Sequence, residues 1–114
     1  MMAPGEWRCD VETLPPGHTA TFRLMCAGRT VHGFAVNHEG RTYAYVNSCP
    51  HVGTSLDLWP NELLSEDKTT LVCSTHGALF APDSGLCLAG PCAGDHLTPL
   101  AVQIDGRDVV VTCE

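Results

Sequence analysis

The sequence is short of three things: chain length, positive charge and long apolar runs. Its 114 residues fit one domain, and they leave no room for a TIM barrel of about 250 residues or for separate cofactor and substrate domains. Six Lys and Arg stand against thirteen Asp and Glu, for a formal net charge of −7. Nucleic acids and anionic membranes need a basic face on their partner, so neither is expected to bind here.

Membrane and export signals are also missing from the sequence. No uninterrupted run of ~18 apolar residues is present, so we expect no membrane span. The first residues, Met1 to Glu6, have neither the basic start nor the apolar stretch of a signal peptide, which favours a cytoplasmic location. The hydrophobic fraction of 44% is typical of a folded chain, and we expect residues 1–114 to form a single domain.

Cysteine is the enriched residue type, with seven in the chain. The count is odd and lies below the roughly 8–10% of a disulfide scaffold. In a reducing cytosol, clustered cysteines are more often metal ligands than disulfides. The cysteines away from any ligand motif are expected to be small, buried or partly buried side chains: Cys9, Cys26, Cys87, Cys92 and Cys113.

Strand-like runs dominate the pattern. β-Branched and aromatic residues between turn signals predict strands over 19–25, 30–36 and 42–46, with a turn over 37–40. Further strands are predicted over 69–72 and in two hairpins, 78–88 and 100–112. Residues 57–68 look like a solvated connector with at most one helical turn at 62–64. The spacing of these runs, about 8–12 residues, indicates an all-β antiparallel sandwich or small barrel.

Two short motifs carry the metal-ligand chemistry. Cys49-Pro50-His51 and Cys73-Ser74-Thr75-His76 each follow a predicted strand, and each offers one thiolate and one imidazole. Such a set suits zinc, and equally a [2Fe–2S] cluster in which two imidazoles replace two thiolates on one iron. Zinc sites usually pair like ligands locally, whereas each motif here is mixed. Two facing loops can then place both thiolates on one metal and both imidazoles on another.

This arrangement resembles the Rieske proteins over about residues 41–114. The resemblance rests on Cys49-Pro50-His51-Val52-Gly53, on Cys73-Ser74-Thr75-His76-Gly77 and on Gly90-Pro91, which is similar to the family's proline loop over the cluster. It implies one [2Fe–2S] cluster in a cluster-binding subdomain at about residues 47–93. It also implies that Cys49 and Cys73 hold an inner iron that stays ferric, and that His51 and His76 hold the outer iron that takes the electron.

Glycines and missing hydroxyls refine the comparison. Gly53 and Gly77 let backbone N–H groups approach the bridging sulfides, or they are simply loop glycines. High-potential Rieske proteins have a loop disulfide at the positions of Thr54 and Thr75, and hydroxyl donors at those of Ala78 and Phe80. Without these donors the reduction potential falls. The chain therefore resembles the low-potential ferredoxins that feed oxygenases.

The resemblance implies a one-electron carrier between a reductase and an oxygenase or other oxidoreductase, with no substrate site of its own. The alternatives are a small accessory subunit of a reductase complex and a zinc-stabilised β module without a redox role. The remaining histidines are expected in the core or on the surface, and Trp59 over the β core or on a partner surface. Four acids form a solvated face or a docking patch for a basic reductase: Asp57, Glu62, Glu66 and Asp67.

Overall fold

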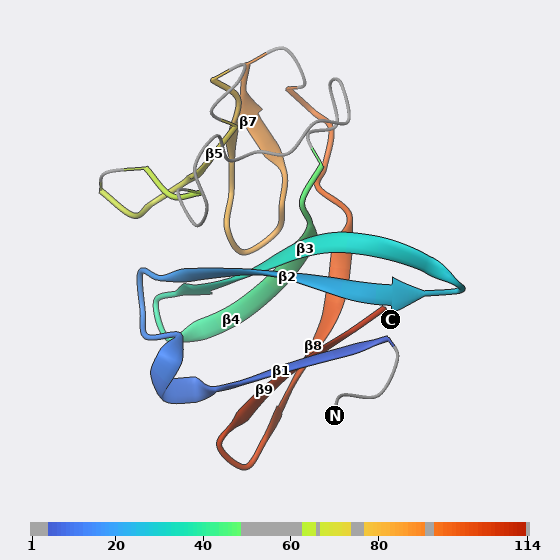
Figure 1. Ribbon diagram of the computed structural model, residues 1–114. Coiled ribbons are helices and arrows are strands. Elements are labelled where there is room, and N and C mark those ends of the chain that lie inside the picture. Colours follow the sequence, from blue (N-terminus) through green and yellow to red (C-terminus); the bar gives the residue numbers. More distant parts are fainter. Residues whose placement is uncertain (1–4, 49–62, 66, 74–76, 91–92, 114) are drawn as a thin grey trace.

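The computed structural model describes residues 5–48, 63–65, 67–73, 77–90 and 93–113, and these form two antiparallel sheets (Figure 1). The larger sheet has the strand order β1-β9-β8-β4-β3-β2. Its strands are β1 (Glu6–Asp10), β2 (Thr19–Cys26), β3 (Arg29–His38), β4 (Arg41–Val46), β8 (Pro99–Asp105) and β9 (Asp108–Thr112). The smaller sheet contains β5 (Leu71–Val72), β6 (Leu79–Phe80) and β7 (Cys87–Ala89). The all-β antiparallel class expected from the sequence is confirmed.

Side chains in the larger sheet alternate between an inner and an outer face. In β2, Phe22 and Leu24 are buried while Arg23 and Met25 are exposed, as a period of two requires. The sheet curls until its two edge strands face each other, and the rings of Trp7 in β1 and Phe22 in β2 stack 4.5 Å apart. The result is a nearly closed barrel. Its interior is filled by Leu14, Phe22, Leu24, Ala35, Ala44, Val109 and Val111.

A second core lies between the outer face of β3 and β4 and the smaller sheet, which Figure 1 shows above the barrel. Tyr45 connects the two layers, since its hydroxyl donates a 2.7 Å hydrogen bond to the Pro82 carbonyl oxygen in the β6–β7 turn. Burial raises the pKa of Tyr45, so the hydroxyl keeps its proton and remains a donor. Gly85 permits this contact, because a Cβ there would lie 2.9 Å from a Tyr45 ring carbon.

The predicted strands agree with the structure apart from their ends. β3 runs to His38, so the predicted turn over 37–40 narrows to Glu39 and Gly40. Both residues have positive φ, 54° and 89°, as in a two-residue hairpin turn that matches the strand twist. The strand β1 and the short 3-10 helix η1 (Val11–Thr13) lie where the sequence predicted neither. No helix among the described residues is long and apolar enough to cross a membrane.

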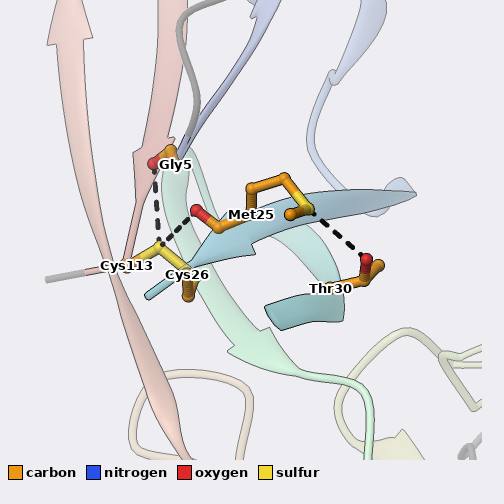
Figure 2. Close-up of a disulfide and its surroundings, with 5 residues drawn as sticks. All are labelled: Gly5, Met25, Cys26, Thr30 and Cys113. Carbon is orange, nitrogen blue, oxygen red and sulfur yellow. Dashed lines mark hydrogen bonds between the residues drawn. A yellow bond between two sulfur atoms is a disulfide. The ribbon is translucent and has the colours of Figure 1, made fainter. Parts of the chain in front are cut away.

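Two sequence-based expectations need correction. The predicted solvated connector is not solvated at Leu63, which is buried and accepts a backbone hydrogen bond from Val72, and Leu64 forms a β-bridge with Leu71. Glu62 lies outside the described residues. Cys26 and Cys113 are not separate small side chains but form a disulfide across 87 residues of sequence (Figure 2). Curling of the sheet brings them together, which local sequence does not reveal.

Candidate metal centre

The second ligand motif begins where β5 ends. Cys73 directly follows this strand and is fully buried. Its N–H donates to the Ala78 carbonyl oxygen at 2.9 Å, and its own carbonyl oxygen accepts from the Gly77 N–H at 2.7 Å. Gly77 has a φ of +71°, a conformation that favours glycine. The two ends of the motif are therefore held together, and residues 74–76, with His76, lie outside the described residues.

The first ligand motif follows β4. The Val46 N–H donates to the Thr98 carbonyl oxygen and the Asn47 N–H to the His32 carbonyl oxygen, both at 2.8 Å. These bonds hold the chain between β3 and the start of β8 as it leaves the sheet, up to Ser48. The predicted ligands Cys49 and His51 lie outside the described residues, as does Gly53.

The segment after β7 packs against the second motif. Gly90 has a φ of +106°, and a Cβ at this position would lie 2.8 Å from the Ala78 Cα. The space between Gly90 and Ala78 is too small for a side chain at position 90. On the far side of Pro91, which lies outside the described residues, Ala93 donates a 3.2 Å hydrogen bond back to the Gly90 carbonyl oxygen. The structure thus places the start of the predicted proline loop beside the end of the Cys73 motif.

The surroundings of Cys73 are apolar. Ala78 and Phe80 are fully buried, and both share a core with Cys73 and Leu71. Neither has a hydroxyl to donate toward a sulfur atom. The contact of Tyr45 with the β6–β7 turn was not predicted from the sequence. Its only sequence signal is Gly85, which follows Asp83 and Ser84.

The other histidines and cysteines singled out in the sequence differ in their burial. His18, His32 and His96 are exposed and His38 is half-buried. In the described part of the chain no three His, Cys, Asp or Glu side chains gather as a metal site. Cys87 is buried, whereas Cys92 and Trp59 lie outside the described residues.

One of the four predicted patch acids, Asp67, is described. It is exposed, and its carboxylate accepts hydrogen bonds from the hydroxyls of Ser65 at 2.6 Å and Thr69 at 2.7 Å. These bonds lower the pKa of Asp67 to about 2. Its negative charge therefore persists at neutral pH, as a docking patch requires. Asp57, Glu62 and Glu66 lie outside the described residues.

The described part of the site fits an iron–sulfur group. Burial disfavours a charged thiolate unless a metal neutralises it, and Cys73 is fully buried at the end of a hydrogen-bonded strand. Soft thiolate ligands suit iron–sulfur clusters and zinc, and the second core leaves Cys73 in apolar surroundings.

Comparison with known proteins identifies the family to which the chain belongs. The family model of the Rieske [2Fe–2S] domain matches residues 7–104. The fold is similar to the ferredoxin of carbazole 1,9a-dioxygenase from Nocardioides aromaticivorans IC177, with a TM-score of 0.71 and 22% identity over 96% of this chain and 98% of that one. It is also similar to a chain in the reduced complex between oxygenase and ferredoxin in carbazole 1,9a-dioxygenase, with a TM-score of 0.77 and 17% identity. That match covers 95% of this chain and 28% of the longer one. No curated protein sequence matches the chain.

The fold and the matching family model define an iron–sulfur protein. Because the family model spans most of its length, the chain belongs to the Rieske [2Fe–2S] domain family. Its cofactor is one [2Fe–2S] cluster.

Proposed function

We propose that the protein is a ferredoxin that accepts an electron from a reductase and passes it to an oxygenase. The observation that carries this proposal is the extent of the structural match, since the fold corresponds to 98% of a ferredoxin chain but to 28% of a longer chain in an oxygenase–ferredoxin complex. A further similar structure is a complex of reduced oxygenase and oxidized ferredoxin, with a TM-score of 0.73 and 20% identity over 98% of this chain and 96% of that one.

The proposed ligand set is Cys49 and Cys73 for the inner iron and His51 and His76 for the outer iron. When bound, the cluster supplies a group that takes up and releases one electron. The chain's own part is to hold the ligand loops. The backbone bonds between Cys73 and Gly77–Ala78 support this role, as does the packing of Gly90 on Ala78. Gly53, Gly77, Ala78 and Pro91 are proposed to surround the bound cluster.

The proposed domain organisation follows from the two cores. Residues 47–93 are proposed as the cluster-binding subdomain of a single domain, 1–114. The second core supports this division, because it joins the smaller sheet to the outside of the barrel through side chains such as Tyr45 and Phe80. A cytoplasmic location is also proposed, and fractionation of cells that produce the protein tests it.

The partners are proposed to meet the protein through charge. A net charge of −7 favours docking on basic surfaces, and exposed Asp67 keeps its charge at neutral pH. We expect the reduced protein to be oxidised by the oxygenase component of carbazole 1,9a-dioxygenase, used as a probe acceptor in anaerobic stopped-flow measurements. The transfer rate is expected to fall as salt rises. Absence of transfer at low salt would count against an oxygenase partner.

The ligand set is tested by one pair of variants. Cys73→Ser is expected to lose the cluster and to destabilise the fold, since metal binding is coupled to folding. Cys9→Ser is the matched control, because Cys9 lies half-buried in β1 among the barrel core residues and is expected to leave two irons and two labile sulfides per chain. Equal loss of the visible spectrum in both variants would overturn the ligand assignment.

A further inference from the structure

The barrel has a seam between β1 and β2. These strands are the two ends of the six-stranded order, and neither backbone pairs with the other. They meet through side chains, with Trp7 stacked on Phe22 at 4.5 Å and an interplanar angle of 21°. The seam is therefore closed by contacts weaker and fewer than the hydrogen-bond ladders that join the other neighbouring strands.

The Cys26–Cys113 disulfide crosses this seam. Cys26 is the last residue of β2, and Cys113 directly follows β9, whose Thr112 pairs with Glu6 at the start of β1. The bond therefore ties β2 to the β1–β9 pair at one end of the barrel (Figure 2). Both cysteines are half-buried, so neither residue is sealed inside the barrel core.

Backbone acceptors for a Cys113 thiol lie beside the disulfide. The Cys113 sulfur lies 3.6 Å from the Met25 carbonyl oxygen and 3.8 Å from the Gly5 carbonyl oxygen (Figure 2). A disulfide sulfur has no proton to donate, but a thiol at this position has two acceptors in place. Cys9 is a poor competitor in exchange, because burial raises the pKa of its thiol and lowers its thiolate fraction.

We propose that the disulfide between Cys26 and Cys113 is reversible, that thiols control it, and that it holds the seam between β1 and β2 closed. A dithiol opens it: the Cys26–Cys113 bond breaks, the two sulfurs of the dithiol join, and its two protons pass to the cysteine sulfurs. The reverse exchange, with a small disulfide as oxidant, closes it again. Static disulfides are rare in a reducing cytosol, so a reversible pair is what the proposed cytoplasmic location favours. This inference stands apart from the ligand set and the partners.

Trp7 reports on the seam directly. The chain has two tryptophans, so Trp59→Phe leaves Trp7 as the sole tryptophan, which is excited selectively at wavelengths that tyrosine does not absorb. We expect dithiothreitol to raise the acrylamide quenching constant of Trp7 by about twofold, because opening of the seam exposes its ring to the quencher. The iron and labile sulfide content of the protein is expected to stay unchanged. Cys26→Ser/Cys113→Ser in the same background is the matched control, with high quenching both with and without dithiothreitol.

Alkylation followed by mass spectrometry shows which state each sample holds. The proposal is overturned if Cys26 and Cys113 are both alkylated in the denatured, air-equilibrated protein before any reduction. It is also overturned if reduction releases both thiols while Trp7 quenching stays constant. Hydrogen exchange of β1, measured in the protein that keeps Trp59, gives a second readout, and exchange there is expected to accelerate on reduction.

Discussion

At Ala78 and Phe80 the side chains next to the Cys73 motif have no hydroxyl. Both residues are fully buried in the core that contains Cys73. Reduction adds one negative charge to a bound cluster, and a hydroxyl aimed at a sulfur stabilises that charge. Without such donors the oxidised form is favoured, and the reduction potential is expected at the low end of the Rieske range.

Phe80→Tyr is expected to raise the reduction potential by roughly 65–125 mV. A charge-assisted hydrogen bond contributes about 1.5–3 kcal/mol, and ~59 mV corresponds to a tenfold change in a one-electron equilibrium. Protein-film voltammetry at neutral pH measures the shift. Ala78→Ser, combined with Phe80→Tyr, is expected to raise the potential further.

Phe80→Met is the control, because it fills a similar volume without a donor. Its potential is expected to match that of the unmodified protein. A Phe80→Tyr potential that stays constant or falls would contradict the role assigned to the missing hydroxyls.

At the scale of elements, the segment after β7 meets the Cys73 motif at a contact where no side chain fits. Gly90→Ala would bring a Cβ within 2.8 Å of the Ala78 Cα, at a φ of +106°. We expect it to destabilise the protein by about 1–3 kcal/mol from backbone strain and by a further amount from the clash. Chemical denaturation followed by circular dichroism measures the loss.

Gly94→Ala separates the two contributions. Gly94 also has a positive φ, +95°, but nothing lies within 4 Å of the position its Cβ would take. It is therefore expected to show the backbone loss alone and to leave the cluster spectrum unchanged. Equal losses in the two variants would mean that the contact with Ala78 contributes nothing.

Elements with strong local patterns were predictable from the sequence, and those defined by distant pairing were not. The runs that form β2, β3 and β4 carry their own alternation and turn residues. The strand β1 has only five residues and depends on its pairing with β9, more than 95 residues later. Leu63 and Leu64 stand among acidic neighbours in a segment that looks solvated, but they pair with Val72 and Leu71 of β5.

The features of the candidate metal centre also divide into those with a local sequence pattern and those that depend on distant pairing. The Cys73 motif and its glycine are local patterns, so their position at the end of a strand was predictable. The contact of Gly90 with Ala78 depends on how β6 and β7 pair, and it carries no local signal. The Cys26–Cys113 bond depends on closure of the whole barrel, so counting cysteines led to the wrong expectation.

For the whole molecule, the disulfide joins residues 87 positions apart and encloses both ligand motifs in one covalent ring. Cross-linking a long loop restricts the unfolded chain. We expect Cys26→Ser/Cys113→Ser to lower the free energy of unfolding by about 2–4 kcal/mol. The dependence on urea should also steepen, because the open chain exposes more surface when unfolded.

Urea titration of the double variant and of the oxidised parent tests this expectation. Cys9→Ser, which leaves the disulfide intact, is the control and is expected to keep the parent's steepness. Identical unfolding midpoints for the double variant and the parent would show that the bond contributes nothing to stability.

The central claim is that this chain is a low-potential, one-electron Rieske protein. Its most direct test is a potentiometric titration of the anaerobically purified protein at neutral pH, followed by electron paramagnetic resonance. We predict one unpaired spin per chain, appearing in a single one-electron step near about −150 mV. A step well above zero would contradict the low-potential assignment, and stoichiometric zinc without any reducible signal would contradict the cluster itself.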